Sequence, residues 1–350
     1  MPRVVGGMPV GADGRVHTTL THNPSSLRLS SVRPNLQNIP RGNDPRQEAE
    51  RWVKEIFVTP DGYLFWERDF SGIEAVLVGY FAGSPTYIRA AKLGVHAFLC
   101  SHIVNQPASW DWSDADLSAY FKEIKGKFKV EYDTAKRIVH GSNYMMTPSK
   151  MQNEYPETFK TTAAATRLQN VYHELFPEIR TWHRDLCLRV DGTKRRRGEV
   201  GERVDPWTLG VCYAENPFGY RHEFYNVIDW ERTETETKET IWHWSFGEDA
   251  KRLVSFLPQS TAAAIIKKSG KRLWHEYPEV GQTMRLWIHD SILGEAREAD
   301  IDEVLLVSQQ VMEAPVEELP LDPAWGLGPF LSIGSEAKVG KSWADMKERK

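Results

Sequence analysis

The chain has 350 residues, of which 41% are apolar and 26% charged, and its formal net charge is −4. This charge excludes a protein that binds polyanions over its whole surface, so any affinity for nucleic acid must come from local clusters. The three cysteines have no metal-type spacing, and we find neither a signal peptide nor an apolar run long enough to cross a membrane, so we expect a protein of the reducing cytoplasm.

The first forty residues are rich in glycine and polar side chains. Residues 1–13 are expected to be irregular. The segment after them carries Arg28, Asn35, Gln37 and Arg41 among few apolar residues. Such donors suit the phosphates and the minor groove of a DNA duplex, but an exposed loop with incidental charge explains them as well. Taken alone, the residues favour the loop.

The first half of residues 63–74 is a short aromatic and aliphatic run, which predicts a buried strand. Apolar residues then recur at spacings of three and four from Ile73 to Phe81, which predicts a helix with one buried face. Asp69 is therefore expected at the end of a strand, where the chain turns into a helix. An acid in this place is held rigidly and still reaches solvent or a ligand.

A second acid follows a second predicted strand. Residues 284–288 are largely apolar, and His289, Asp290 and Ser291 come directly after them. Magnesium takes oxygen ligands, usually one or two carboxylates together with substrate phosphates. Asp69 and Asp290, at the ends of two strands, therefore predict a site for a pair of divalent metal ions.

Residues 131–146 predict a helix with a polar stripe. Tyr132, Lys136, His140 and Tyr144 are spaced four apart, so they lie on one helical face. Lysine, imidazole and phenol at successive turns make little sense as a core stripe. They suit a surface that contacts a triphosphate, a sugar and a base in turn, because lysine offers a compact charge and tyrosine an aromatic face.

The remaining segments predict scaffold elements. Helical spacing from residue 161 to 189 is interrupted at Pro177. The basic run at 194–197 is expected to be a solvated face or a contact to the template strand. Alternating polar and aromatic residues at about 213–246 predict a β-hairpin with a polar tip. Pro258 lies near the start of a predicted helix that Pro278 ends.

Several of these segments resemble motifs of family A DNA polymerases, the group of bacterial DNA polymerase I and many phage replicative enzymes. The matching segments are, in the family's order, residues 14–18 (entry into the palm), 28–40 (pre-palm signature), 69–74 (first palm motif), 132–145 (fingers helix), 289–291 (last palm motif, usually His-Asp-Glu) and 333–343 (final palm strand). Together they extend from Gly14 to Trp343, which is nearly the whole chain.

The resemblance implies an α+β fold, the right-hand fold of polymerases, with an antiparallel palm sheet and helical fingers. It divides the chain into a first palm segment at 1–75, fingers at 76–250 and a second palm segment at 251–350. The family's thumb and exonuclease domains have no counterpart in this sequence. We therefore expect them on a separate chain, or this chain to be part of a larger one.

The resemblance also implies the reaction, the template-directed addition of dNMP to a primer 3′-hydroxyl with release of pyrophosphate, in a bacterium or a phage-infected cell. Primer–template DNA and dNTPs would be the partners. Asp69, Asp290 and Lys136 would be catalytic, and the two acids with the backbone carbonyl of Phe70 would hold two Mg²⁺ ions, with Mn²⁺ as a substitute. The nucleotide-binding residues would be Glu74, His96, Lys136, Arg137, His140 and Tyr144. The DNA-binding residues would be Arg28, Asn35, Gln37, Lys251, Ser255, Gln259 and His289.

Several positions depart from the family pattern. They are Tyr132 (usually Arg), His140 (Phe or Tyr), Met145 (Gly), Lys251 (Arg), Ser255 (Asn) and Ser291 (Glu). Two alternatives therefore stay open, a non-catalytic or weakly active DNA-binding subunit that needs a partner chain, and a relative of single-subunit RNA polymerases. Glu74 argues for deoxynucleotides, because the matching glutamate crowds the 2′ position of the sugar. The two acids and Lys136 argue for catalysis.

Overall fold

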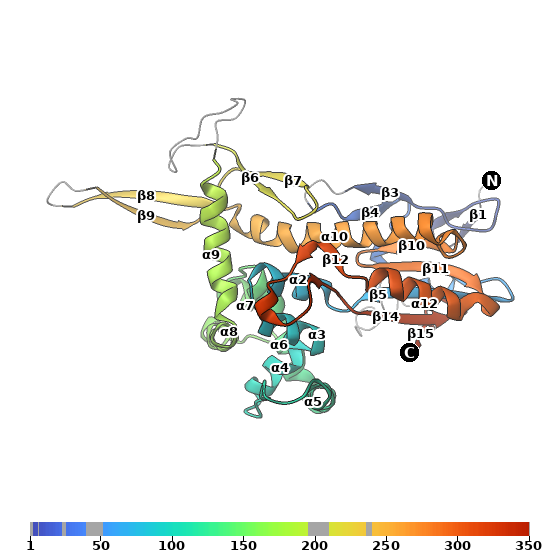
Figure 1. The fold of residues 1–350 in the computed structure, drawn as a ribbon, viewed down its shortest axis with the longest axis horizontal. Coiled ribbons are helices and arrows are strands. Elements are labelled where there is room, and N and C mark those ends of the chain that lie inside the picture. The colour runs from blue at the N-terminus through green and yellow to red at the C-terminus, as the bar shows by residue number, and fades with distance from the viewer. Residues whose placement is uncertain are drawn as a thin grey trace. The chain divides into compact units, whose positions relative to one another are not determined.

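The computed structural model describes residues 3–5, 7–22, 26–39, 52–194, 210–235 and 240–349 (Figure 1). The chain forms two compact units. The sheet unit comprises Met1–Ile73 and Gln259–Lys350, and the helical unit comprises Glu74–Pro258. Arg41 and residues 195–197 of the basic run lie outside the described residues.

The described part of the sheet unit contains a five-stranded antiparallel sheet. Its strands are β5 (Tyr63–Phe70), β10 (Met284–Ile288), β11 (Ser291–Arg297), β14 (Ser335–Gly340) and β15 (Lys347–Arg349), in the order β10-β11-β5-β14-β15. The aromatic residues of β5 favour such a pleated, largely buried position. The strands predicted in the first half of residues 63–74 and at 284–288 are confirmed.

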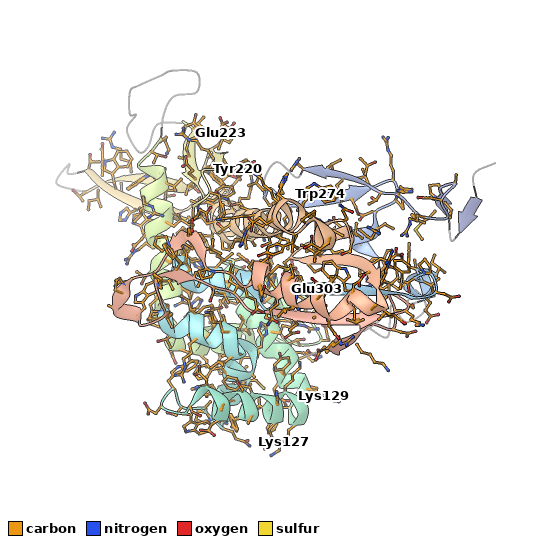
Figure 2. The ribbon with its side chains drawn as sticks, turned by 45° about the vertical axis from the view of Figure 1, so that its right-hand side comes forward. Lys127, Lys129, Tyr220, Glu223, Trp274 and Glu303 are labelled. Atoms are coloured by element: carbon orange, nitrogen blue, oxygen red, sulfur yellow. The ribbon has the colours of Figure 1, made fainter. Side chains whose placement is uncertain are left out.

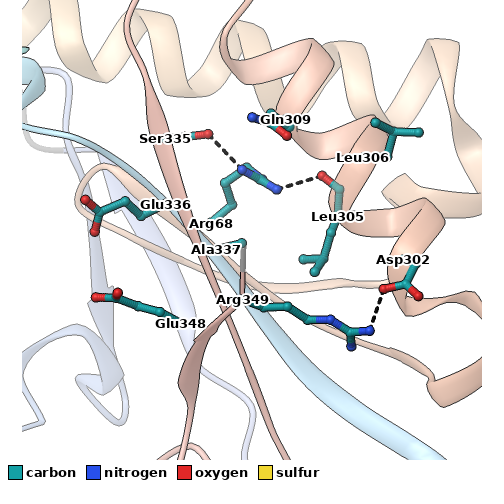
Figure 3. Close-up of a pocket in the computed structure, with 10 residues that line it drawn as sticks. All are labelled: Arg68, Asp302, Leu305, Leu306, Gln309, Ser335, Glu336, Ala337, Glu348 and Arg349. Carbon is teal, nitrogen blue, oxygen red and sulfur yellow. Dashed lines mark hydrogen bonds and ion pairs between the residues drawn. The ribbon is translucent and has the colours of Figure 1, made fainter. Parts of the chain in front are cut away.

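One face of this sheet is fastened to helix α12 (Ile301–Met312) by a buried arginine. Arg68 of β5 is 4% exposed, and its guanidinium donates to Ser308 Oγ at 2.9 Å, Ser335 Oγ at 3.0 Å and the Leu305 carbonyl at 2.7 Å. Figure 3 shows this side chain between β14 and α12, beside a cavity of about 430 Å³. Arg68 thereby fixes both neighbours relative to β5.

The same face places a tryptophan over a glycine. Trp66 of β5 is fully buried, pairs in register with Gly294 of β11, and donates its indole N–H to Thr283 Oγ1 at 3.0 Å. A methyl group at Gly294 would overlap the indole ring. Glycine is therefore required here by the close approach of a neighbouring side chain.

The opposite face carries a small apolar core made from distant parts of the chain. Its buried members are Met8, Leu36, Phe65, Leu286, Ile288, Leu293 and Trp343. Met8 belongs to a hairpin of β1 (Arg3–Val5) and β2 (Met8–Val10), so the prediction that residues 1–13 are irregular is wrong. Burial of Met8 against the sheet gives this glycine-rich segment a fixed register, which local sequence pattern does not reveal.

Short elements complete the sheet unit. They are β3 (Thr19–His22), β4 (Leu29–Val32), η1 (Leu36–Asn38), α1 (Trp52–Glu55), α11 (Pro278–Gly281), η3 (Glu298–Asp300), β12 (Val316–Pro320), η4 (Pro323–Trp325) and β13 (Phe330–Leu331). β3 pairs with β4, and β12 pairs with β13.

The helical unit is built around an aromatic core. Its helices are α2 (Ile73–Phe81, which starts in the sheet unit), α3 (Pro85–Leu93), α4 (Val95–Ile103), α5 (Asp114–Lys127), α6 (Lys129–Asn143), α7 (Pro148–Glu154), α8 (Thr162–Leu175) and α9 (Pro177–Asp191). The core includes Tyr87, Phe98, Tyr172 and Phe176, and the ring centroids of Tyr87 and Phe176 are 4.8 Å apart. The helix predicted at 73–81 and the interruption at Pro177 are confirmed.

The segment predicted as one β-hairpin at 213–246 is corrected. Its described residues form two hairpins, β6 (Cys212–Glu215) with β7 (Arg221–Phe224), and β8 (Ile228–Glu234) with β9 (Thr240–Phe246). Asn216 makes the turn between β6 and β7, since its side chain accepts from the backbone N–H groups of Phe218 and Tyr220 at 3.0 Å each. The chain therefore reverses once more than the alternation of polar and aromatic residues predicted. Lys194, the first residue of the basic run, is buried and pairs with Asp191 at 2.8 Å.

The helix predicted to begin near Pro258 starts eight residues earlier. Helix α10 (Ala250–Glu276) contains Pro258 in its interior. The start was predicted wrongly because Leu253, Val254 and Leu257 are buried in the helical unit, and this burial outweighs the backbone hydrogen bond that proline removes. Among the described residues, no helix is long and apolar enough to span a membrane.

Candidate active site

The two predicted acids lie at neighbouring strand ends of the sheet unit. Asp69 of β5 pairs in register with Ser291, the first residue of β11. The backbone N–H of Phe70 donates to the carbonyl of Asp290 at 3.3 Å, so the chain segments that carry the acids are directly bonded. Asp290 lies in the turn between β10 and β11, after His289, whose φ of 55° places it in the left-handed region. The structure therefore brings Asp69 and Asp290 together.

The donor atoms of this site fit magnesium. Both aspartates are half-buried, and their carboxylates, with the backbone carbonyl of Phe70, offer hard oxygen ligands. Within the described residues, no group of three or more His, Cys, Asp or Glu side chains is arranged to hold a metal ion. A pair of carboxylates that leaves the other positions to water and substrate phosphates is the arrangement that magnesium prefers.

A third carboxylate, absent from the sequence-based site, lies beside this pair. The hydroxyl of Ser291 is 2.9 Å from Glu67 Oε1 and 3.1 Å from the Ile288 carbonyl. Glu67 precedes Asp69 by two residues on β5, so both side chains leave the same face of the strand. This alternation was visible in the sequence, but only the contact with Ser291 shows that Glu67 lies beside the candidate site.

The pre-palm residues support strand β10 from within the protein. Gln37 donates from Nε2 to the Trp287 carbonyl at 2.7 Å and accepts from the Ser31 N–H at 3.0 Å. Asn35 Oδ1 accepts from the Ser31 hydroxyl at 2.9 Å. The structure thus uses Asn35 and Gln37 in internal hydrogen bonds next to the strand that leads to Asp290. Arg28 is half-exposed.

The polar stripe of the helical unit runs along α6. Lys136 and His140 are exposed, and Tyr132 is half-buried with its ring centroid 6.1 Å from that of His96 on α4. The rings of His140 and Tyr144 are 5.3 Å apart. The predicted helix of 131–146 is shorter at its end, because α6 stops at Asn143 and Tyr144 is its C-cap residue.

The end of α6 is fixed by a buried polar network. Asn143 Oδ1 accepts from the hydroxyls of Tyr87 at 2.9 Å and Tyr172 at 2.5 Å, and the Asn143 carbonyl accepts from His183 Nε2 at 3.0 Å. Next to this anchor, the Tyr144 hydroxyl donates to Glu74 Oε2 in the first turn of α2. The network holds Glu74 and Tyr144 together as one unit.

Three of the four remaining DNA-binding candidates of the sequence follow one another on α10 at four-residue spacing. Lys251 is exposed, and Ser255 and Gln259 are half-buried. The Ser255 hydroxyl donates to the Arg252 carbonyl at 3.1 Å, and so stays close to the helix backbone. His289, in the turn before Asp290, is exposed.

Comparison with known proteins identifies the family. The statistical model of DNA polymerase family A matches residues 7–204. The chain belongs to DNA polymerase family A. The thermostable DNA polymerase I of Thermus thermophilus is 27% identical over 340 residues, which cover 96% of this chain and 33% of the relative. DNA polymerase I of Deinococcus radiodurans is 27% identical over 319 residues, which cover 90% of this chain and 28% of the relative.

A solved structure supports the fold. It is the polymerase domain of Pol1 from M. smegmatis in complex with DNA primer-template and dNTP, with a TM-score of 0.66, 22% identity, and coverage of 96% of this chain and 49% of that chain. The resemblance inferred from the motifs is thus confirmed, as is a mixed fold of helices and sheet. The chain spans about a third of the length of these two curated relatives.

The structure shows the conformation or contacts of two residues that depart from the family A pattern, Met145 and Tyr132. Met145, where the family usually has glycine, adopts a φ of 56°, a conformation that glycine reaches without strain. Tyr132, where the family usually has arginine, packs against His96, and the ammonium of Lys125 lies 5.6 Å from its ring centroid. Lys127 and Lys129 are exposed near the start of α6 (Figure 2). These lysines supply positive charge in the region where the family arginine is missing.

Arg137 and His96 are less available to a nucleotide than the sequence suggested. Arg137 is held by an ion pair with Glu157 at 2.9 Å and by a hydrogen bond to Thr158. Burial, together with the nearby positive charges of Lys136 and His140, lowers the pKa of His96 to about 4. At neutral pH, His96 therefore offers a phosphate a hydrogen bond but no charge.

Buried histidines give the helical unit an expected pH dependence. Burial lowers the pKa of His96 to about 4, of His173 to about 3 and of His183 to about 4, from an ordinary value of 6.5. Between the lowered pKa values of the folded chain and the ordinary value of 6.5, the unfolded chain binds more protons than the folded one. Stability is therefore full above pH 6.5 and falls as the pH drops toward 4. Urea titrations at pH 7 and pH 5 should differ by a few kcal/mol in the free energy of unfolding.

Substitutions test whether the buried histidines cause this pH dependence of stability. His183→Gln keeps a donor for the Asn143 carbonyl but removes the titration, so the loss of stability between pH 7 and pH 5 should become smaller. His243→Gln, at an exposed position on β9, should leave it unchanged. Equal pH dependence in the parent chain and in His183→Gln would contradict the assignment.

Proposed function

We propose that this chain is a template-directed DNA polymerase that adds dNMP to a primer 3′-hydroxyl and releases pyrophosphate. The observation that carries the proposal is the bonded pair of strand ends that holds Asp69 beside Asp290. Family membership supports it, since the similar curated proteins are named DNA polymerase I. The structural neighbour, which carries primer-template DNA and dNTP, agrees with DNA and nucleotides as ligands.

The acid pair is proposed to bind the metal ions. Asp69, Asp290 and the carbonyl of Phe70 would hold two Mg²⁺ ions, and Mn²⁺ would substitute because it accepts the same oxygen donors. When bound, such ions lower the pKa of an attacking hydroxyl and neutralise charge on a leaving phosphate. The chain's own contribution is rigidity, because β5, β11 and the Phe70–Asp290 hydrogen bond fix both carboxylates before substrate binds.

The stripe on α6 is proposed to bind the incoming nucleotide. The exposed ammonium of Lys136 contacts the triphosphate and stabilises charge on the leaving pyrophosphate. His140, also exposed, lies against the sugar, and Tyr144 offers its ring to a base. Glu74, fixed by the Tyr144 hydroxyl, narrows the space at the 2′ position and selects deoxynucleotides.

The proposed DNA contacts are polar side chains with exposed ends. Arg28 and His289 contact primer phosphates, and Lys251, Ser255 and Gln259 present a polar edge of α10 to the duplex. Asn35 and Gln37 act mainly by positioning β10, since their side chains are bonded to Ser31 and Trp287.

Primer extension by the chain with Mg²⁺ tests the proposal. A labelled primer on a longer template should be extended with dNTPs and only poorly with rNTPs. Extension with both nucleotide types at similar rates would favour a relative of single-subunit RNA polymerases. Binding of the duplex without any extension would favour a non-catalytic DNA-binding subunit. Adding dideoxynucleotides to the same assay measures how strongly they are excluded with His140 at this position.

Sugar selection should depend on the pair of Glu74 and Tyr144. Glu74→Ala should raise rNTP incorporation relative to dNTP by about tenfold or more, because the crowding group is removed. Tyr144→Phe keeps the ring but loses the hydroxyl that holds Glu74, so it should relax selection to a smaller degree. Competing dNTP and rNTP extension rates give the ratio directly. An unchanged ratio in Glu74→Ala would remove this role from Glu74.

A further inference from the structure

Glu67 is held at the candidate active site by a serine. Ser291 is 2% exposed, and its hydroxyl donates to Glu67 Oε1 at 2.9 Å. Ser291 directly follows Asp290 in the chain and pairs in register with Asp69. Glu67 is therefore fastened to the residue that adjoins one acid and faces the other. Its carboxylate is fixed beside the pair.

The sheet register places Glu67 on the same face as Asp69. In β5, side chains of residues two apart leave the same face, and Arg68 between them points to the opposite face, toward α12. On β14, Lys338 pairs with Glu67 and Glu336 pairs with Asp69. Figure 3 shows Glu336 pointing away from Arg68, as expected if Glu336 and Asp69 share the face opposite to Arg68. Glu67 thus has Lys338 on one side and Ser291 on the other.

This arrangement is informative because Ser291 occupies the position of the usual glutamate in the last palm motif. The chain lacks a carboxylate there, but Glu67 reaches the same residue from the adjacent strand. We propose that Glu67 supplies from β5 the negative charge that the His-Asp-Ser turn lacks, with Ser291 as its anchor, and that this charge strengthens divalent cation binding by Asp69 and Asp290. The inference rests on the proposed function, which assigns the metal ions to these two acids.

Glu67 acts as a positioning residue and not as a third ligand. The described residues contain no group of three acidic or other ligating side chains arranged around one metal position. A carboxylate near a doubly charged ion still attracts it over several ångströms, since the interior of a protein screens charge less than water does. The expected effect is on the affinity for the ion.

Manganese binding to the full chain, without DNA or nucleotide, measures this effect. Electron paramagnetic resonance counts free Mn²⁺ and yields a dissociation constant. Asp69→Asn should abolish the tightest binding. Glu67→Gln should raise the dissociation constant about fivefold, because it removes one charge while its amide oxygen still accepts from Ser291. Glu303→Gln, an equal charge change on α12 (Figure 2), should leave the constant unchanged.

Two further variants separate an electrostatic role from a structural one. If Glu67 only paired with Lys338 to hold the sheet together, Lys338→Met and Glu67→Gln would weaken Mn²⁺ binding alike. The proposal expects the opposite sign: Lys338→Met should lower the dissociation constant, because a nearby positive charge disappears. The double variant Glu67→Gln with Ser291→Glu should restore the parent affinity, since the charge returns to the other strand.

The test of Glu67 by Mn²⁺ binding does not depend on whether the chain is an active polymerase. In primer extension, Glu67→Gln should raise the Mg²⁺ concentration for half-maximal rate severalfold while kcat at saturating Mg²⁺ changes little. If the chain does not extend primers, the Mn²⁺ constants still decide the role of Glu67. A dissociation constant for Glu67→Gln equal to that of the parent and of Glu303→Gln overturns the inference, even where polymerase activity is intact.

Discussion

Asp69→Asn and Asp290→Asn should each reduce primer extension by about a thousandfold or more, with the fold intact. Each substitution removes a negative charge from a site that is proposed to hold two doubly charged ions. Asparagine keeps the size of the side chain and leaves the backbone bond from Phe70 to Asp290 in place. Single-nucleotide extension under saturating Mg²⁺ gives the rate, and circular dichroism with thermal unfolding gives the fold.

The matched control lies near the other end of the same strand. Asp61 is exposed in the turn before β5, so Asp61→Asn makes the same chemical change without touching the site and should extend primers like the parent. If Asp69→Asn or Asp290→Asn retained a rate within tenfold of the parent, the two acids would not be the metal site. The proposed mechanism would then be wrong, whatever the family.

Gly294→Ala should destabilise the sheet unit by about 3 kcal/mol, because overpacking a rigid core forces side chains and backbone to move. The added methyl group would overlap the indole of Trp66 on the neighbouring strand. That ring cannot turn away, since it is fully buried and bonded to Thr283. Chemical denaturation, followed by tryptophan fluorescence, measures the loss.

A second glycine provides the comparison. A methyl group at Gly334, which precedes β14, meets no atom within 4 Å, so Gly334→Ala should change stability by less than 1 kcal/mol. Adding Trp66→Phe to Gly294→Ala should recover part of the loss, because the smaller ring leaves room for the methyl group. Equal stability of Gly294→Ala and Gly334→Ala would show that the sheet adjusts to Gly294→Ala without cost.

The elements around the candidate site could be predicted from the sequence because their local patterns agree with their tertiary places. The aromatic run of β5, the change of spacing at Ile73 and the apolar run of β10 each occur at a boundary that the structure also has. Their places at two strand ends made Asp69 and Asp290 candidates for one metal site, and the resemblance to the family supported bringing them together. More than two hundred residues separate them in the chain, and nothing local encodes the register of β5 against β11.

Several features that the sequence analysis missed have tertiary causes. The true start of α10 depends on burial of Leu253 and Leu257, so a rule about proline placed it wrongly. The internal hydrogen bond of Gln37 could not be foreseen, because its amide reaches the Trp287 carbonyl, 250 residues away in the chain. Glu67 was overlooked because its proposed role depends on its hydrogen bond to Ser291, which the sequence showed only as the replacement of the usual glutamate. In each case the decisive partner is distant along the chain.

Burial of the three cysteines in the folded chain makes their thiols slow to react. Cys100, Cys187 and Cys212 are all buried and free, and burial raises the pKa of their thiols to about 11, about 12 and about 11. Thiolates are the reactive form, so all three should resist maleimide reagents while the chain stays folded. A fluorophore would thus attach to a single added surface cysteine and not to the three native ones, so its signal would report on one chosen position without background labelling.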